Sequence, residues 1–520
     1  LSEPEHQIVY YIDPATPKEW VPYLIQGIND WNKAFEEAGF KNAIVGKEVP
    51  EGSDISPDDA RYSFLRYLPS EKENAYGPRI VDPRSGEIIE SHICWYHNVM
   101  NLLTKWYMTQ CGPLDKRAQK MTFDKDLMGK LIRFVSSHEV GHTLGLRHNM
   151  VASHATPVEK LRDKNLVEKH GHTASIMDYA RFNFVAQPED NIGEAGLFPR
   201  INDYDKWAIK WGYQYRPEFK DEFEEKKVLR SEVTKALTAN HRLRYKGDEG
   251  RGQDPRSQIE DLSDNDIVAN EYGIKNLKRV MQNIVQWTAQ PDGQTDDLET
   301  MYSAVRSQFQ RYCGHDGRYI NGVYSDNWPS TRNNDIVPAA LQKDAIAWLG
   351  RHLFTLPHWL YPDSIVNKLG VNANDDLTRT STLWLNYFLS AKTLYRCATN
   401  SFTASKPYPV NDYLNDLFQA IWKPMSQTNQ RDNNYRRKLE QNYVDCIGLV
   451  INPEKTAKDN TKTEPSDATL YALKHLDMID NFCQQQLKKS NADGINALHY
   501  KNLMLKTKKI RDTYSKPTAE

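Results

Sequence analysis

The chain has 520 residues, more than one ordinary hydrophobic core organises, so we expect several domains rather than a single small binding module. Apolar residues make up 39% and charged residues 26% of the chain, which excludes whole-chain disorder and a coiled-coil rod. The formal net charge of -2 provides no overall attraction to nucleic acid or anionic membranes, and we expect no nucleic-acid partner.

The sequence shows no membrane span and no clear processing signal. It lacks a run of about 20 apolar residues, the length that crosses a bilayer, so we expect no transmembrane segment in this chain. The chain begins at Leu1 without Met or an apolar leader, and we expect a processed chain or a piece of a longer one. Six scattered cysteines form no CxxC pair and are equally compatible with one or two disulfides or with six buried thiols. The sequence does not indicate an oligomeric state.

The first part of the chain combines strand and helix signals. An apolar run predicts a buried strand over residues 8–12, and a capping box at residues 16–19 starts a helix whose apolar stripe continues to Gly39. Further strands are expected over residues 43–49, 61–68 and 87–93, and helices over residues 95–110, 126–144 and 202–213. We therefore place a domain boundary near residue 215.

The remainder of the chain carries mainly helical signals. Helical apolar spacing is found over residues 270–287, 300–312, 338–354 and 380–394, and polar stretches at residues 246–264, 325–335, 426–437 and 453–467 indicate loops. The predicted fold class is α+β, with a twisted sheet and long helices in residues 1–215. A mostly α-helical region in residues 216–520 follows, which either folds independently or packs on the first part.

The sequence SHEVGHTLGLRH contains the pattern HExxHxxGxxH. His138 and His142 lie four residues apart on one helical face, so both imidazoles can reach one metal ion. Gly145 lets the chain leave the helix, which brings His148 in as a third nitrogen ligand. Water completes such a site, and Glu139 is the expected general base that activates it.

Three neutral imidazoles leave a zinc ion its full double charge, which suits hydrolytic chemistry. The alternative for a bare HExxH pattern is an amphipathic helix whose histidines lie at the surface, but the longer pattern seldom arises by chance. The spacing therefore predicts one catalytic zinc ion, held by His138, His142 and His148.

The histidine pattern resembles that of the metzincin zinc endopeptidases, whose second signature is a turn carrying Met below the metal. Met177 in the sequence SIMDY, 29 residues after His148, fits this Met-turn. Tyr179 matches the tyrosine that some metzincins place near zinc, where it ligates the resting metal or stabilises the oxyanion. For both residues the alternative is ordinary packing in a core.

Several longer stretches are similar to one subgroup, the bacterial Met-zincin family of large envelope proteases: RHNMVAS, SIMDYARFNFVAQPED, NAYGPRIVDPRSGEIIESHICWYHNVM and YDKWAIKWGY. The resemblance covers residues 1–215 well and the helical region only diffusely. It implies a metzincin-type catalytic domain in residues 1–215 and a zinc-dependent metalloendopeptidase that cleaves protein or peptide substrates. It also implies an extracytoplasmic location, which is periplasmic, cell-surface or secreted.

The same resemblance suggests where a substrate would bind. The residues after Met177 are candidates for the substrate pocket, namely Asp178, Arg181 and Phe182. The segment 86–93 occupies the place of the edge strand that binds an extended peptide in the clan, although an ordinary sheet strand explains it equally well. A helix and loop over residues 95–120 depart from better-known metzincins and leave the shape of the cleft open.

Other candidate ligands are weaker. Asp82, Asp203 and Asp205 could form a calcium site, but loop aspartates usually cap turns or face water. Five further histidines lie near the pattern but not at its spacing: His92, His97, His154, His170 and His172. Two other functions fit the sequence, a surface binding or adhesion protein that retains a zinc site and a zinc hydrolase of a non-peptide substrate. The intact Glu139 argues against the first.

Overall fold

The computed structural model describes residues 1–247, 254–326, 334–403, 407–426, 428–453, 467–489 and 494–515. These residues form two compact units. The first unit holds the described residues up to Tyr312, and the second holds residues 313–325 and those from 334 onward.

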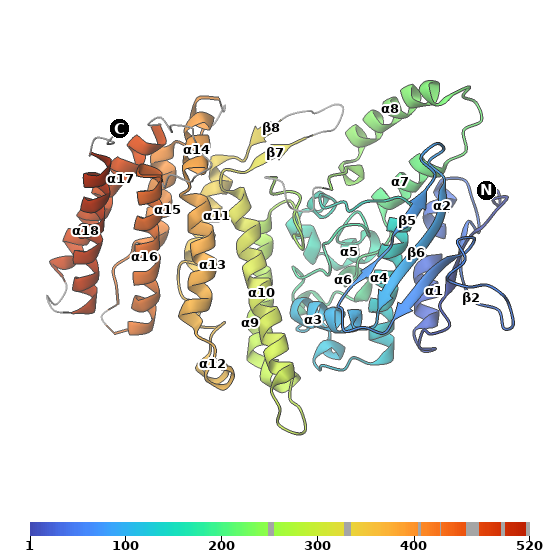
Figure 1. Cartoon of the computed structure of the whole chain (residues 1–520), viewed down its shortest axis with the longest axis horizontal. Coiled ribbons are helices and arrows are strands. Elements are labelled where there is room, and N and C mark those ends of the chain that lie inside the picture. Colours follow the sequence, from blue (N-terminus) through green and yellow to red (C-terminus); the bar gives the residue numbers. More distant parts are fainter. Residues whose placement is uncertain are drawn as a thin grey trace. The chain divides into compact units, whose positions relative to one another are not determined.

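A mixed sheet organises the first half of unit 1 (Figure 1). Its parallel strands lie in the order β2 (Ile44–Glu48), β1 (Ile8–Ile12), β3 (Ser63–Leu68) and β6 (Ile88–Tyr96). All four were predicted to within a few residues, because their apolar runs are long enough to be recognised. The mixed sheet confirms the α+β fold class.

The edge of the sheet differs from the prediction. β6 pairs on one side with β3 and on the other with two short antiparallel strands, β4 (Ala75–Tyr76) and β5 (Arg79–Val81). The edge is therefore formed by residues 75–81 and not by the predicted segment 86–93, which lies inside the sheet. Strands of two and three residues are too short to show an alternating pattern, so the sequence did not reveal them.

Two helices pack against each other and against the sheet, α1 (Val21–Asn29) and α4 (Lys125–Thr143). The hydroxyl of Ser137 in α4 donates to the backbone oxygen of Gly27 at 3.0 Å. The predicted helix ending at Gly39 is divided into α1 and α2 (Asn32–Glu37). The chain turns at Trp31, whose indole N–H donates to the Ser137 backbone oxygen at 2.9 Å, so a tertiary contact decides the break.

The other described helices of unit 1 surround this centre. They are α3 (Val99–Cys111), α5 (Lys164–His170), α6 (Glu194–Leu197), α7 (Asp203–Tyr213), α8 (Glu222–Ala239), α9 (Asp266–Trp287) and α10 (Asp296–Tyr319), the last of which continues into unit 2. Short 3-10 turns connect several of them: η1 (Lys116–Ala118), η2 (Ser153–Ala155), η3 (Val158–Arg162), η4 (Pro188–Asp190) and η5 (His241–Leu243).

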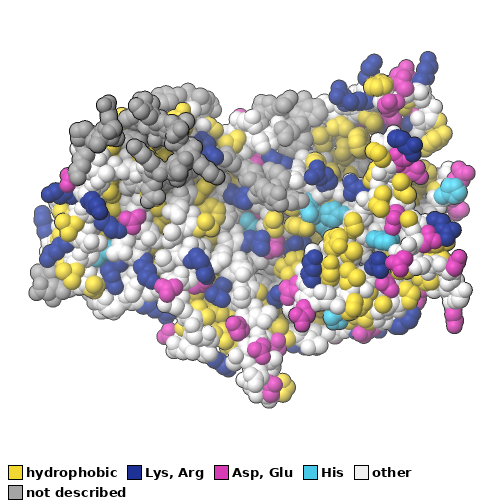
Figure 2. All heavy atoms as spheres, viewed as in Figure 1, with side chains coloured by type: hydrophobic (Ala, Val, Ile, Leu, Met, Phe, Trp, Pro, Cys, Tyr) yellow, Lys and Arg dark blue, Asp and Glu magenta, His cyan; other side chains and the backbone are white. Residues whose placement is uncertain are grey.

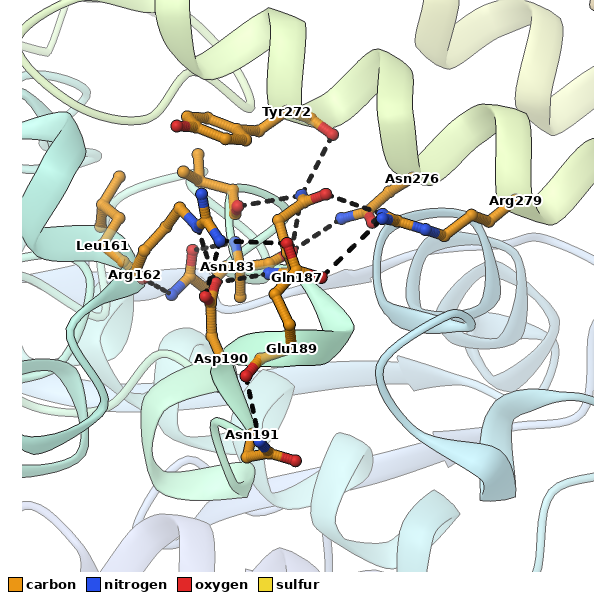
Figure 3. Close-up of polar contacts among 12 residues, drawn as sticks. Leu161, Arg162, Asn183, Gln187, Glu189, Asp190, Asn191, Tyr272, Asn276 and Arg279 are labelled. Atoms are coloured by element: carbon orange, nitrogen blue, oxygen red, sulfur yellow. Dashed lines mark hydrogen bonds and ion pairs between the residues drawn. The ribbon is translucent and has the colours of Figure 1, made fainter.

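The predicted boundary near residue 215 falls inside unit 1, which extends to Tyr312. Figure 3 shows why α9 belongs to this unit. The Asn276 amide donates to the backbone oxygens of Phe184 and Ala186, both at 2.9 Å, and the Gln187 amide donates to the Tyr272 oxygen at 3.3 Å. Buried carbonyl groups need such partners, so α9 completes the segment that follows the predicted Met-turn.

We expect limited proteolysis of the full chain to give no stable fragment ending near residue 215. Removing α9 would leave the buried oxygens of Phe184 and Ala186 without donors, and it would take fully buried side chains such as Leu277 and Val280 out of the core. Mass spectrometry of the products would test this. A soluble fragment of residues 1–215 that still binds zinc would contradict it.

Unit 2 is mostly helical, as predicted. Its helices are α11 (Ala339–His352), α12 (Asp363–Leu369), α13 (Ala373–Phe388), α14 (Ala391–Thr403), α15 (Val410–Ile421), α16 (Gln430–Ile451), α17 (Asp467–Leu487) and α18 (Ile495–Tyr514), and a hairpin pairs β7 (Val323–Ser325) with β8 (Asn334–Ile336). The predicted loop at 426–437 overlaps the start of α16. The polar residues at the start of α16 did not predict a helix. Asn429 caps this helix, and polar residues such as Asn433 are buried in it.

The surface carries charges of both signs, and the cysteines that the structure describes form no disulfides. Basic and acidic side chains are interspersed over the face shown in Figure 2. In the part of the chain that the structure describes, no helix is long and apolar enough to cross a membrane. All six cysteines are thiols and five of them are buried, which is one of the two states that the sequence allowed.

Candidate metal centre

Helix α4 presents the first two histidines of the pattern. The helix begins after Asp124, whose carboxylate accepts from the Leu127 backbone N–H at 2.9 Å and so caps the first turn. His138 and His142 lie one turn apart near its C-terminal end, with ring centroids 4.8 Å apart. The two imidazoles therefore share one face, as the spacing predicted.

The third histidine reaches the same place through a glycine turn. Gly145 follows the helix with φ at 101°, in the left-handed region that favours glycine, and no atom lies within 4 Å of where its Cβ would be. Backbone conformation, not lack of space, therefore requires glycine here. The turn places the His148 Nε2 3.1 Å from the His142 Nε2.

The ring nitrogens are oriented to bind a cation. One ligand atom from each of the three histidines lies within 4.8 Å of the other two. The Nδ1–H of His138 donates to the Ile176 oxygen at 2.8 Å and that of His142 to the Leu146 oxygen at 3.1 Å. The lone pair of each of these two Nε2 atoms is then free to face the cluster, as in zinc-binding histidines whose other ring nitrogen donates to a backbone carbonyl.

Burial sets the protonation of the centre. It lowers the pKa of His138 well below its usual value, and the neighbouring His142 and His148 lower it further, so the ring is neutral as a ligand must be. The His138 Nε2 is buried without a hydrogen-bond partner among the described residues. A buried unpartnered acceptor beside two further imidazoles fits a zinc ion, which takes three nitrogen ligands in hydrolytic sites.

Glu139 lies beside the cluster and is 6% exposed. Burial raises its pKa to about 8, against the opposing effects of Arg181 and of a hydrogen bond from the Gly77 backbone. Its Oε2 has no hydrogen-bond partner among the described residues. This oxygen is the second buried polar atom without such a partner at the centre, after the His138 Nε2, and it can accept from a water or a substrate group.

The edge of the sheet contacts helix α4 directly, and the sequence did not indicate this contact. A Cβ on Gly77 would lie 2.6 Å from the backbone oxygen of Glu139, so only glycine permits this approach. Two residues later, the Arg79 guanidinium donates to the backbone oxygen of His142 at 2.9 Å. The sequence NAYGPR holds both residues, and only its likeness to the family marked it.

The residue predicted for the Met-turn lies directly against helix α4. Met177 is fully buried, and a Cβ on Gly141 would lie 2.3 Å from its Sδ. The backbone oxygen of Met177 also accepts from the N–H of Asn149, the residue after the third histidine, at 2.9 Å. This turn therefore supports both ends of the histidine pattern.

Replacing Gly141 with Ala is expected to destabilise the zinc-loaded chain by about 1–3 kcal/mol, because an added methyl group has no room against Met177. The midpoint of chemical denaturation measures this change. Gly212→Ala is the matched control: it also lies in a helix, nothing lies within 4 Å of its Cβ position, and its stability should not fall. Equal stability of both variants would contradict the close packing.

Asp205 holds the turn in place from α7. Its carboxylate accepts from the Ser175 hydroxyl at 2.5 Å and from the backbone N–H of Ile176 at 2.7 Å. It also accepts from the Asn202 N–H in a capping box, a local signal that is visible in the sequence. Asp205 was predicted only as a weak candidate for a calcium site, and its contacts with the Met-turn were not predicted.

The structure does not bring the three calcium candidates together. Asp82 pairs with Arg84 at 2.7 Å and Asp203 pairs with Arg242 at 2.5 Å, while Asp205 binds the Met-turn. Within the described residues, the histidine triad is the one group of three such side chains that could hold a metal ion. Aspartates in turns commonly bind their nearest donors, which is the alternative that the sequence left open for these residues.

Tyr179 lies beside the histidines, as predicted. Its ring centroid is 4.1 Å from that of His148 and 5.5 Å from that of His138. The ring therefore borders the same space as the three Nε2 atoms.

Two of the three predicted pocket residues are buried, and the third is nearly so. Asp178 is 1% exposed and accepts from the Thr173 hydroxyl at 2.9 Å, and Phe182 is fully buried against Tyr107 with centroids 4.8 Å apart. The Arg181 side chain is 12% exposed. Asp178 and Phe182 therefore lie in the core of unit 1, and their assignment to a substrate pocket stays a prediction.

The other weighed histidines lie outside the cluster. His92 pairs with Glu90, His97 contacts Tyr67, His154 contacts the Ser263 oxygen and His172 contacts the Arg181 oxygen. The His170 backbone oxygen accepts from Asn202. None of the five belongs to the group that could hold a metal among the described residues.

A helix with the HExxHxxGxxH pattern, a glycine turn to the third histidine and a buried Met below them define a metzincin-type zinc site. The sequence profile of the Met-zincin family matches residues 120–429, more than half of the chain, and the chain belongs to this family. The match extends far into the helical region, beyond the predicted limit near 215. No curated protein and no solved structure matches the chain.

Proposed function

We propose that the chain is a zinc-dependent metalloendopeptidase. The observation that carries this proposal is the convergence of three imidazole nitrogens beside the buried Glu139 Oε2, which has no partner among the described residues. Membership of the Met-zincin family supports it. When bound, zinc supplies Lewis acidity, which lowers the pKa of water and polarises a carbonyl group.

The residues around the metal position would bind the ion, transfer the proton and stabilise the oxyanion. His138, His142 and His148 would hold one zinc ion through their Nε2 atoms. Glu139 is placed to accept a proton from the attacking water and to deliver it to the leaving amine. Tyr179, whose ring lies against His148, would donate a hydrogen bond to the oxyanion that develops on the carbonyl.

A peptide fits the edge of the sheet next to this centre. β5 pairs with β6 on one side, and in the described part of the chain no strand pairs with its other side. Arg79 at its start contacts His142, so a peptide added to this edge would run past the histidines. A groove of about 1020 Å³ borders the same region, lined among others by Arg79, Val81 and Leu146. The extracytoplasmic location remains a prediction from the family resemblance.

Incubating the zinc-loaded full chain with a diverse peptide library tests the proposal. Cleavage products identified by mass spectrometry, absent from the Glu139→Gln variant, would support an endopeptidase. A zinc-loaded chain that cleaves no peptide would contradict it. Selective retention of intact peptides would then favour a binding protein, and hydrolysis of non-peptide esters or amides would favour another zinc hydrolase.

A further inference from the structure

Arg181 adopts a backbone conformation that is unfavourable for arginine. Its φ is 57°, in the left-handed region, where a side chain costs free energy that the surrounding contacts must offset. The residue follows the Met-turn, two positions after Tyr179. Such outliers gather at functional sites, so the contacts of its side chain are informative.

The guanidinium of Arg181 lies between two aromatic rings. Its central carbon is 3.7 Å from the ring centroid of Trp106 in α3 and 4.1 Å from that of Tyr179. The Tyr179 ring also lies beside His148, with centroids 4.1 Å apart. A planar guanidinium suits this stacked arrangement, and a lysine ammonium cannot reproduce it.

Glu260 holds this arrangement from a segment 79 residues further along the chain. Its Oε1 lies 3.7 Å from the Arg181 Nε, and its backbone N–H donates to the Tyr179 oxygen at 2.9 Å. Its Oε2 lies 3.2 Å from the Arg311 Nε and accepts from the Gln110 amide at 3.2 Å. Glu260 is 2% exposed, so these contacts lie inside the protein. It binds the backbone of Tyr179 and also the guanidinium of Arg181, which stacks on the Tyr179 ring.

We propose that Arg181 is a positioning residue: stacked on Trp106 and paired with Glu260, it fixes the Tyr179 ring beside the metal-site histidines. This inference rests on the proposed function, in which the Tyr179 hydroxyl stabilises the oxyanion. Small displacements of such a group cost much of its effect, so a rigid support for Tyr179 serves catalysis. The helix α3, which better-known metzincins were expected to lack, supplies Trp106 and Gln110 to this support.

Three variants of the zinc-loaded full chain separate the effects of the stacked guanidinium, of the whole Arg181 side chain and of the Glu260 charge. Arg181→Lys keeps the charge and the backbone but loses the planar stack, and Arg181→Gly removes the side chain while suiting a φ of 57°. Glu260→Gln leaves Arg181 in place without its charged partner. Arg379→Lys is the control, because this arginine pairs with Asp376 on the surface of unit 2 and its side chain is 78% exposed.

Nitration of Tyr179 by tetranitromethane, followed by peptide mass spectrometry, measures how firmly the ring is held without any substrate. We expect about tenfold faster nitration in both Arg181 variants and a smaller increase in Glu260→Gln, with zinc content unchanged, because a desolvated cation–π contact is lost or weakened. The control should match the parent. Nitration at the parental rate in both Arg181 variants would overturn the inference, whether or not the chain cleaves peptides.

Kinetics then distinguish positioning from a general structural role. If the chain cleaves peptides, Arg181→Lys should lower kcat about tenfold with KM nearly unchanged. In a Tyr179→Phe background the same change should have almost no further effect, because Arg181 acts through the Tyr179 hydroxyl. Losses that multiply in the double variant would show that Arg181 does not act through Tyr179.

Discussion

Replacing Glu139 with Gln is expected to lower the rate of peptide hydrolysis by roughly a hundredfold to ten-thousandfold, the usual effect of removing a general base. The amide keeps the size of the side chain but accepts protons poorly. His138, His142 and His148 are untouched, so zinc content should stay at the parental value. Initial rates on a peptide that the parent cleaves, together with metal analysis of the same sample, measure both quantities.

A suitable control for this experiment is Glu36→Gln, since Glu36 is exposed on α2. It should leave both the rate and the zinc content unchanged. Parental turnover in a metal-replete Glu139→Gln variant would show that Glu139 is not the base. Loss of zinc from that variant would instead show that its carboxylate supports the metal.

Replacing His148 with Ala is expected to weaken zinc binding by at least about a hundredfold. Residues that only orient a ligand commonly contribute ten- to a hundredfold to metal affinity, and His148 is itself one of three nitrogen donors. The loss should appear as a higher dissociation constant in competition with a chelator. Activity at a fixed zinc concentration should fall with it.

The matched control is His97→Ala, which removes an exposed histidine that contacts Tyr67 and lies outside the triad. Its zinc affinity should equal that of the parent. If His148→Ala bound zinc as tightly as the parent, the third ligand would have been assigned wrongly, and the 3.1 Å approach of its Nε2 to that of His142 would have another explanation.

Membership of the Met-zincin family and the geometry of the site support the proposed peptidase function separately. The family profile matches residues 120–429, whereas the sheet edge that approaches Glu139 lies before residue 120. The contacts of Gly77 and Arg79 with α4 therefore connect a segment outside the match to the metal helix. This placement is why we assign peptide binding to β5.

Local signals in the sequence determined the helix that carries the histidine pattern and the candidate zinc ligands. The spacing of His138 and His142 places them on one face of any helix, and Gly145 adopts the turn because only glycine enters that conformation at low cost. The four parallel strands followed from their apolar runs in the same way. Each of these features depends on residues that are close together in the chain.

Tertiary structure decided what distant residues contribute. Glu260 reaches Arg181 across 79 residues, and Asn276 binds the oxygen of Phe184 across 92, so no local pattern marks either contact. The same reason explains the domain boundary, because unit 1 needs α9 to satisfy its buried carbonyl groups. The sequence by itself determined the candidate ligands and the class of the site, and only the packing of distant segments decided how far unit 1 extends and which residues contact Tyr179.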